Sequence, residues 1–382
     1  MKLKNKDECT GCGLCSNVCP AECIKMERDS EGFYYPFVNQ KICVVCGRCE
    51  KYCYNTVTNP PKEVHVYAAY NKDLIRRLKA SSGGIFELLS REVLSRQGVV
   101  FGVKMDGLEA IHTYVETLED LDLLLGSKYM QSDVGRSYQQ VKEFLQEGRW
   151  VLFSGTPCQV DALLKFLGEK PECLLTVDFI CHGISSPKVF EKYIDENVEL
   201  NGNPTQICFR DKTEGWNDFS IAMITEKGQY YRKNMHEDVY LQSFLKNMNL
   251  RRSCFNCVFR TVARVSDLTL GDFWGCENIW KDWMENKGYS LIFVQNEKGK
   301  KFWNSIQNGI ISREVDLEKV LAYNQSMLIS PWDKYSRDLF FKMIRKETIA
   351  DSIKKVEKNE KGREKKGRKR KGLRGEIWCV YN

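Results

Sequence analysis

The sequence lacks any long run of apolar residues. Nothing in its 382 residues approaches the roughly 18 consecutive apolar residues that a transmembrane helix requires. The N-terminus, MKLKNKDECTGC, also lacks the apolar segment of a secretory signal peptide. These two absences predict a cytoplasmic protein, where thiols stay reduced and a framework of disulfides is not expected.

The body of the chain also lacks net charge, although the whole sequence carries +7. Residues 351–375 contain 12 Lys or Arg against 4 Asp or Glu, and the rest of the chain contains 46 against 47. This basic stretch has no interleaved aromatic residues, which argues against a nucleic-acid partner. We predict a solvated, disordered tail over residues 351–382 that could touch an anionic membrane surface and hold the protein there peripherally.

Cysteine, in contrast, is abundant, with 17 residues. Two copies of the pattern C-x2-C-x2-C-x3-C are formed by Cys9, Cys12, Cys15, Cys19 and by Cys43, Cys46, Cys49, Cys53. This spacing is typical of bacterial ferredoxins with two 4Fe-4S clusters, in which the fourth cysteine of each copy binds the other cluster. We therefore predict that Cys53 completes the first cluster and Cys19 the second. A zinc site, the alternative, pairs two C-x2-C knuckles across a gap and does not have this spacing.

The remaining sequence indicates an α+β protein in which the ferredoxin-like module precedes an α/β domain with a mixed sheet. Pro60 and Pro61 predict a linker near residues 56–63, so the module covers residues 1–60. Residues 64–204 alternate helical and strand patterns, as in a largely parallel sheet. Residues 205–345 have more strand patterns and predict a second, mixed layer that packs on the first.

Apolar periodicity predicts the individual elements of both halves. In the first half it predicts helices near 85–97, 138–147, 158–167 and 187–194, and strands near 99–103, 150–154 and 174–180. In the second half it predicts a helix near 238–248 and strands near 206–210, 219–225, 229–233, 267–273 and 290–296.

Two loops could bind a phosphate group. The first contains Ser81, Ser82, Gly83 and Gly84, directly before the predicted helix at Ile85. Small residues at a helix N-terminus let a phosphate approach free backbone amides, although such a loop is more often only a helix cap. The second is the turn from Gly155 through Thr156 to Cys158, at the carboxyl end of a strand, where ligands of open α/β sheets bind. Together they favour a nucleotide-sized cofactor.

A third C-x2-C pair, Cys254 and Cys257, cannot hold a cluster alone. Cys158 and Cys181 lie at predicted strand ends of one sheet and could complete a third site, with Cys276 in reserve. The alternative is that each is a buried small apolar residue, which is how we interpret the isolated Cys23, Cys173, Cys208 and Cys379. His182 could contact a cofactor, but a single histidine is more often structural.

These motifs resemble a known family. SSGGIF, GSKYMQS (126–132), VLFSGTPCQV, DFICHGISSPKVF, FRDKTEGW (209–216), CFNCVFRTVARVSDLTLGDFWG (254–275) and GYSLIF occur in its order. Residues 64–345 thus resemble the coenzyme F-420 hydrogenase/dehydrogenase beta-subunit family, here with a fused two-cluster ferredoxin. Lys79 and Ala80 stand where serine is commoner in that family.

The resemblance implies FAD in the α/β domain, a 4Fe-4S cluster beside it, and hydride exchange with a deazaflavin, coenzyme F-420. It implies that the SSGG loop (Ser81 to Gly84), Lys128, Gly155 and Thr156 approach the flavin nucleotide, and that Cys158, Cys181, Cys254 and Cys257 bind the third cluster.

We therefore expect an iron-sulfur flavoprotein oxidoreductase. It would move electrons between a hydride-carrying small molecule, reduced F-420 or a substitute, and one-electron acceptors such as ferredoxin or a partner redox enzyme. The alternative is an electron-transfer subunit without flavin chemistry of its own that serves a partner enzyme, for instance in polysaccharide or cell-envelope metabolism of an anaerobe.

Overall fold

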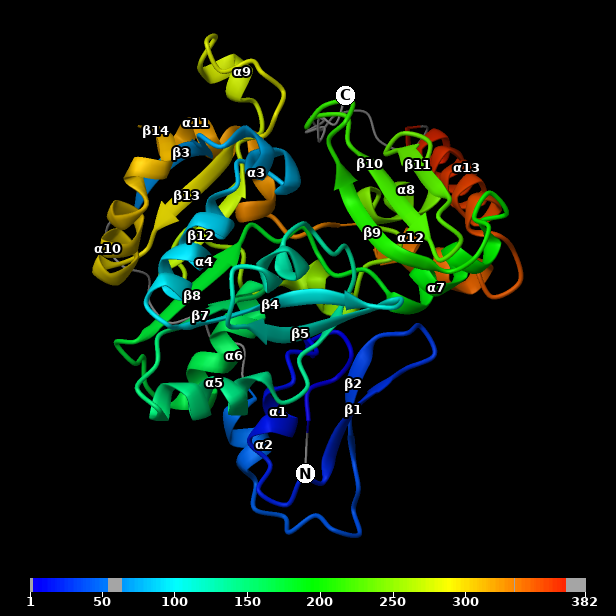
Figure 1. Cartoon of the computed structure of the whole chain (residues 1–382). Coiled ribbons are helices and arrows are strands. Elements are labelled where there is room, and N and C mark those ends of the chain that lie inside the picture. The colour runs from blue at the N-terminus through cyan, green and yellow to red at the C-terminus, as the bar shows by residue number, and fades with distance from the viewer. Residues whose placement is uncertain (1–2, 54–63, 333, 369–382) are drawn as a thin grey trace.

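The structure is a computed structural model that describes residues 3–53, 64–332 and 334–368. Figure 1 shows a small N-terminal module below a central sheet with helices on both faces, and a lobe with a smaller sheet to one side. The central sheet has nine strands in mixed orientation. This architecture confirms the predicted α+β class with a mixed sheet. The predicted linker at 56–63 lies outside the described residues.

The N-terminal module contains two short helices and one hairpin. Its elements are α1 (Leu14–Asn17), β1 (Ile24–Arg28), β2 (Tyr34–Val38) and α2 (Arg48–Tyr52). β1 and β2 pair antiparallel, with Ile24 opposite Val38. Each helix begins directly after a left-handed glycine, Gly13 at φ 74° or Gly47 at φ 70°, within a C-G-x-C turn. The repeated cysteine pattern therefore produces a repeated loop and helix.

The central sheet has the strand order β14-β3-β13-β12-β8-β7-β4-β5-β6. Its strands are β3 (His65–Asn71), β4 (Val99–Asp106), β5 (Glu109–Val115), β6 (Ser132–Asp133), β7 (Val151–Ser154), β8 (Leu174–Phe179), β12 (Leu268–Asp272), β13 (Ser290–Val294) and β14 (Ile310–Glu314). The middle of the sheet, from β4 through β7 and β8 to β12, is parallel. The carboxyl ends of β7 and β8 therefore lie next to each other.

Helices and short 3-10 turns surround this sheet. The helices are α3 (Leu74–Lys79), α4 (Ile85–Ser95), α5 (Ser137–Gln146), α6 (Pro157–Leu167), α9 (Cys276–Ile279), α10 (Glu297–Ser305) and α11 (Leu317–Tyr323). Of these, α9 lies in a loop that projects beyond the upper edge of the sheet (Figure 1). The 3-10 turns are η1 (Asp120–Leu124), η2 (Arg252–Asn256), η3 (Gln307–Gly309) and η4 (Gln325–Met327).

Alternate strand residues form two separate cores. On one face, Val100 and Leu152 pack with Leu89 of α4 and Trp303 of α10. On the other face, the next residues along the strands, Phe101 and Phe153, pack with α5 and α6 and with Leu14 and Val18 of the N-terminal module. The module is therefore part of the hydrophobic core beneath the sheet.

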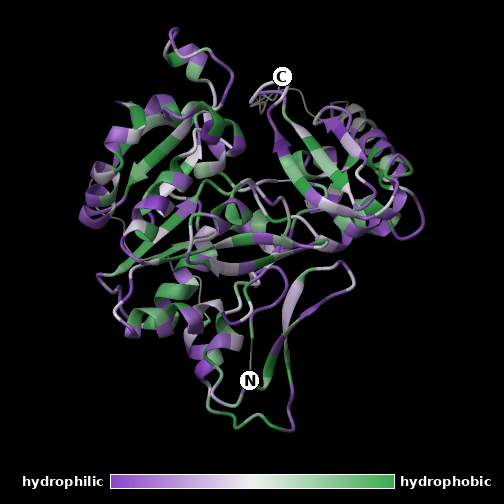
Figure 2. Ribbon diagram, in the orientation of Figure 1, coloured by the Kyte–Doolittle hydropathy of each residue, from purple (hydrophilic) through white to green (hydrophobic). Residues whose placement is uncertain are grey.

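The side lobe is built on a three-stranded antiparallel sheet. Its elements are α7 (Pro187–Glu196), β9 (Pro204–Asp211), β10 (Ser220–Thr225), β11 (Tyr230–Asn234), α8 (Val239–Leu245), α12 (Lys334–Met343) and α13 (Ile349–Arg368), with the strand order β11-β10-β9. Figure 2 shows hydrophobic residues along β10 of this sheet and β13 of the central sheet. The lobe core contains Phe190, Tyr240 and Phe340 together with Phe33 of the N-terminal module.

The predicted helices and strands are confirmed within a few residues, but their grouping differs from the prediction. We predicted residues 205–345 as one second layer, whereas β12, β13 and β14 join the first sheet and only β9–β11 form a separate one. β13 pairs antiparallel with β3, a strand that we did not predict. Pairing between strands this distant in sequence leaves no local pattern.

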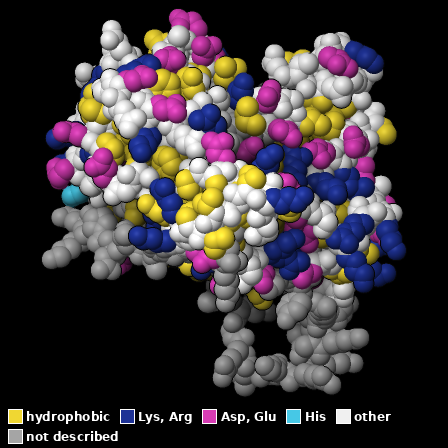
Figure 3. Space-filling view, turned by 90° about the horizontal axis from the view of Figure 1, so that it is seen from below, with side chains coloured by type: hydrophobic (Ala, Val, Ile, Leu, Met, Phe, Trp, Pro, Cys, Tyr) yellow, Lys and Arg dark blue, Asp and Glu magenta, His cyan; other side chains and the backbone are white. Residues whose placement is uncertain are grey.

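Part of the predicted solvated tail is instead a helix that packs on the lobe. Residues 349–368 form α13, in which Ile349, Ile353 and Val356 are buried in the lobe core. Their spacing of four and three residues puts them on one helix face, so this stretch does have an apolar side. Figure 3 shows Lys and Arg side chains gathered over the side of the molecule that holds this lobe. Residues 369–382 lie outside the described residues.

Candidate functional site

The first group of cysteines surrounds one cavity. Cys9, Cys12, Cys15 and Cys53 all line it. Burial raises the pKa of the Cys12 thiol to about 11, and it raises the pKa of Cys15 well above the usual value. The structure thus brings the fourth cysteine of the second copy to the first three cysteines of the first copy, as the spacing predicts.

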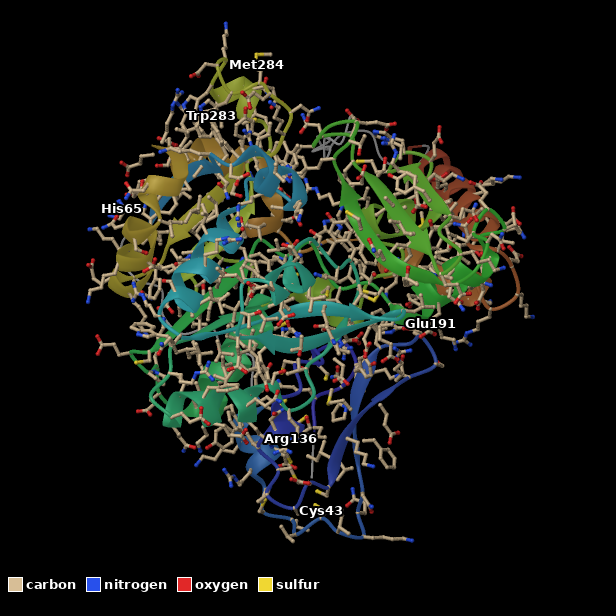
Figure 4. All side chains as sticks on the ribbon, viewed as in Figure 1. Cys43, His65, Arg136, Glu191, Trp283 and Met284 are labelled. Carbon is tan, nitrogen blue, oxygen red and sulfur yellow. The ribbon has the colours of Figure 1, made fainter. Side chains whose placement is uncertain are left out.

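The second group surrounds a second cavity. It is lined by Cys43, Cys46, Cys49 and Cys19. Cys46 is exposed, and Cys43 lies at the end of the module farthest from the central sheet (Figure 4). The first cavity therefore faces the body of the protein, and the second lies toward the outer end of the module.

Cys23 also lines the second cavity, although we predicted it to be an isolated apolar residue. It is buried, and its Sγ lies 3.3 Å from that of Cys19. Burial opposes ionisation of Cys19, but hydrogen bonds from Cys23 and from backbone amides lower the pKa of Cys19. Cys23 lies outside the repeated pattern, so spacing gave no reason to place it here.

The third group brings together four cysteines from three segments. Cys158 lies in the first turn of α6, after β7, and Cys181 follows β8. Cys254 and Cys257 lie in and directly after η2. Burial raises the pKa of Cys158 well above its usual value and that of Cys254 to about 12. The thiols of Cys181 and Cys257 raise the pKa values of both Cys158 and Cys254 further.

Cys276, the reserve candidate, lies elsewhere. Its Sγ donates to Glu277 and to the carbonyl of Trp283, in a core that packs under α11. The structure therefore favours Cys158 and Cys181 as the partners of the C-x2-C pair.

The third group adjoins the first cavity. Cys158 lines that cavity together with Cys12, and the Cys12 thiol raises the pKa of Cys158. The hydroxyl of Tyr138 donates to the carbonyl of Cys12 at 2.7 Å, which fixes the module against the sheet at this point. The third group, in the body of the protein, therefore lies next to the first group, in the module.

The donors of these three groups are thiols, which are the usual ligands of iron-sulfur clusters. Within the described ranges, no three Cys, His, Asp or Glu side chains converge closely enough to hold one metal ion. A cubane instead takes four thiolates spread around a cage, which is how the cysteines line the first two cavities.

The predicted phosphate loop from Ser81 to Gly84 contacts the GSKY segment. The hydroxyl of Ser127 donates to that of Ser81 at 2.7 Å. The Ser82 hydroxyl donates to the carbonyl of Tyr289, and the Gly83 amide donates to the hydroxyl of Ser290. A Cβ on Gly83 would lie 2.5 Å from the Ala69 carbonyl oxygen, so close packing explains this glycine. The N-terminus of α4 has no side-chain cap.

Two lysines lie at this loop. Lys128 Nζ donates to the carbonyl of Leu125 at 2.7 Å, and burial lowers its pKa to about 7. Lys212 Nζ donates to the carbonyls of Arg77 and Ser82, and burial lowers its pKa to about 7 as well. We did not assign a role to Lys212, although it belongs to the FRDKTEGW segment.

The other predicted flavin contacts lie at the third cysteine group. The Thr156 hydroxyl is 3.1 Å from Cys158 Sγ, and Thr156 also bonds Gln159 through its amide. His182 follows Cys181, and its ring packs edge-on against Phe244 with centroids 5.0 Å apart. Its Nε2 is buried and has no hydrogen-bond partner within the described part of the chain. Burial, reinforced by the nearby Arg260, lowers the pKa of His182 to about 4, so the ring is neutral.

Comparison with known families finds matches to two segments of the chain. Residues 3–25 match the 4Fe-4S binding domain, and residues 148–319 match the family described as the C terminus of the coenzyme F420 hydrogenase/dehydrogenase beta subunit. Residues 148–319 belong to the F420 hydrogenase/dehydrogenase beta-subunit family. The region of this chain that matches the family runs from before β7 into α11 and contains all four cysteines of the third group.

The chain is thus an oxidoreductase with an iron-sulfur binding motif and an electron-transfer role. Among solved structures, a chain of the F420-reducing [NiFe] hydrogenase complex from Methanosarcina barkeri is similar, with 17% identity and a TM-score of 0.46. The alignment covers 77% of this chain and 98% of that one. The search of curated proteins finds no match. No helix in the described ranges is both long and apolar enough to span a membrane.

Proposed function

We propose that this protein transfers electrons between a hydride carrier and a one-electron acceptor, through FAD and three 4Fe-4S clusters. One observation carries the proposal: Cys158 belongs to the third cysteine group and also lines the cavity of the first. A cofactor in the α/β domain would therefore have a continuous row of cluster sites leading through the module.

Three sets of four cysteines would hold the clusters. The first is Cys9, Cys12, Cys15 and Cys53, the second is Cys43, Cys46, Cys49 and Cys19, and the third is Cys158, Cys181, Cys254 and Cys257. Bound FAD would accept two electrons as a hydride, and each cluster would carry one electron at a time. The buried thiols of the first and third groups would bind as thiolates, because iron supplies the positive charge that the buried groups lack.

The SSGG loop, Lys128 and Lys212 would hold the flavin nucleotide. The uncapped N-terminus of α4 presents backbone amides and the positive end of the helix dipole. A phosphate there would favour the protonated form of both lysines. Gly155, Thr156 and His182 lie at the third cysteine group and would contact the cofactor on the side of that cluster.

An electron-transfer subunit without flavin is the second candidate. One observation favours it: the Ser82 hydroxyl and the Gly83 amide are already used within the chain. In that case a partner enzyme would supply electrons directly to the third cluster.

The partner we propose is a redox enzyme or a ferredoxin, because the matched family consists of beta subunits, and the second cluster would meet it at the exposed end of the module. Reduced coenzyme F-420 or another hydride carrier would be the small-molecule substrate. Contact between the basic C-terminal segment and an anionic membrane surface stays a prediction.

Anaerobic purification and donor screening test the proposal. We expect about one FAD and about twelve irons per chain, four for each cluster. Reduced F-420, NADH, NADPH and reduced ferredoxin are then compared as donors, with flavin and cluster bleaching as the readout. Twelve irons without flavin would support the second candidate, and a colourless protein would refute both.

A further inference from the structure

Arg251 is a fully buried arginine between the first and third cysteine groups. It has no exposed surface, and it directly precedes η2, which carries Cys254. The Cys254 amide donates to the Arg251 carbonyl at 3.0 Å. The backbone of Arg251 therefore belongs to the third group, while its side chain extends toward the N-terminal module.

The Arg251 guanidinium contacts Cys9. Its Nε donates to the Cys9 carbonyl at 2.8 Å, and its Nη2 lies 3.6 Å from Cys9 Sγ. Nη1 donates to the side-chain oxygen of Gln131 at 3.2 Å, and the same oxygen accepts the amide of Tyr34. The module and the body thus hold the guanidinium in one position, with one N–H directed at a proposed cluster ligand.

No carboxylate in the described part of the chain forms an ion pair with Arg251. Its neighbours in the fold, Arg252 and Arg337, both pair with Glu31. Arg251 instead lies over the ring of Tyr35, with 4.0 Å between the guanidinium carbon and the ring centroid. A buried cation is costly without a counter-charge. A 4Fe-4S cluster with four thiolates carries net negative charge and would supply it.

The second cavity has no equivalent cation among the described residues. Gly11 of the first copy lies against Arg251, because a Cβ there would be 2.9 Å from Nη1. The corresponding residue of the second copy is Val45, which is exposed. Arg48 lines the second cavity but is exposed to solvent. Two sites built from the same cysteine pattern therefore differ in one buried, hydrogen-bonded positive charge.

We propose that Arg251 is a positioning residue that raises the reduction potential of the first cluster above that of the second. The inference rests on the proposed function, because it needs a cluster at Cys9. Reduction adds one electron, supplied by the upstream carrier, and makes the cluster more negative. A fixed buried cation with a hydrogen bond to a ligand sulfur stabilises that state more than the oxidised one. Electrons arriving from the third cluster would collect at the first.

The test is a redox titration of the full chain, monitored by electron paramagnetic resonance under anaerobic conditions. In Arg251→Gln, which keeps a hydrogen-bond donor but loses the charge, we expect the ratio of reduced to oxidised first cluster at a fixed potential to fall about tenfold. This corresponds to a shift of about 59 mV for one electron. The second cluster should change little. The third, whose Cys254 also lies within the field of the Arg251 charge, should shift less than the first, because the guanidinium donates to Cys9 and not to Cys254. Arg252→Gln is the matched control, since Arg252 pairs with Glu31 and Asp338 and does not contact Cys9.

Unchanged potentials in an Arg251→Gln protein with full iron content would overturn the inference. If this variant loses iron, Arg251→Lys keeps the charge with a shorter reach and should show a smaller shift in the same direction. An Arg251→Lys protein in which the potential of the first cluster is not above that of the second would then overturn it. Absence of iron at the first site in the wild-type chain is a different result, which refutes the proposed function itself.

Discussion

Arg337 of α12 donates to the carboxylate of Glu31 in the N-terminal module, across 306 positions of sequence. Arg337 is fully buried, and its Nε also donates to the carbonyl of Leu250, directly before Arg251. This pair joins the module, the third cysteine group and the C-terminal helices. It therefore holds the first and third cysteine groups at fixed positions relative to each other.

Replacing Glu31 should therefore destabilise the protein. Glu31→Gln leaves the guanidinium of Arg337 buried without its nearest carboxylate, and we expect a loss of about 3 kcal/mol in the free energy of unfolding. Urea unfolding followed by circular dichroism under anaerobic conditions measures it. Glu27→Gln, an exposed change on β1, is the control and should leave the midpoint unchanged. Equal midpoints for both variants would contradict the structural role of the pair.

Replacing Val45 by glycine should stabilise the module. Val45 has a φ of 52°, in the left-handed region where a β-branched residue is strained, and the first copy has Gly11 at this position with a φ of 69°. The strain costs about 1–3 kcal/mol, and glycine adds back about 0.5–1 kcal/mol of unfolded-state entropy. We expect Val45→Gly to gain about 1 kcal/mol of stability by urea unfolding.

Val44→Gly is the matched control for this prediction. Val44 is also exposed but is not among the described residues with positive φ. It should lose about 0.5–1 kcal/mol, because glycine there adds only entropy to the unfolded state. Equal destabilisation by both changes would show that Val45 is not strained.

Local sequence patterns were enough to predict the features that depend on residues close together in the sequence. The cysteine spacing assigns Cys53 to the first cavity because two loops of fixed length exchange their fourth cysteines. Most helices and strands followed from apolar periodicity for the same reason. The apolar positions of α13 were also present in the sequence, at Ile349, Ile353 and Val356, but the density of lysine and glycine after them hid the pattern.

Long-range contacts were outside the reach of these patterns. Lys212 reaches the Ser81–Gly84 loop only because β9 ends beside α3, and Arg251 reaches Cys9 across 242 positions. Neither residue has a neighbour in sequence that indicates its contact. The third cysteine group is an intermediate case, since two strand ends and one C-x2-C pair were recognisable but their meeting depends on the sheet order.

The stability contribution of Lys128 should depend on pH. Burial lowers its pKa to about 7, whereas an unfolded lysine has a pKa of about 10.4. Between these values the unfolded chain binds more protons than the folded chain, so stability rises with pH. The cost of burying the charge is fully present below about pH 7 and is gone above about pH 10.4.

Lys128→Met removes this pH-dependent cost. Urea unfolding of both proteins, freed of flavin, from about pH 6.5 to pH 10 measures the difference between them, because a bound phosphate would raise the pKa of Lys128. The variant should be most stable relative to wild type at the acid end, and its advantage should shrink as pH rises. Lys25→Met, at an exposed position on β1, is the control. A constant difference between Lys128→Met and wild type across this range would contradict the prediction.

Removing Cys158 should block electron transfer from the flavin to the N-terminal module, while the module keeps its two clusters. In Cys158→Ala the third site keeps three of its four proposed ligands, so we expect iron to fall by about four per chain while the signals of the other two clusters remain. Dithionite, a small reductant, should still reduce those clusters. The hydride donor found active with the wild-type chain should reduce them at least about tenfold more slowly, because the row of sites is broken next to Cys12.

Cys173→Ala changes a partly exposed cysteine directly before β8 and should leave iron content and rate unchanged. Full iron content in Cys158→Ala would remove Cys158 from the ligand set, and an unchanged rate would mean that electrons enter the module by another route.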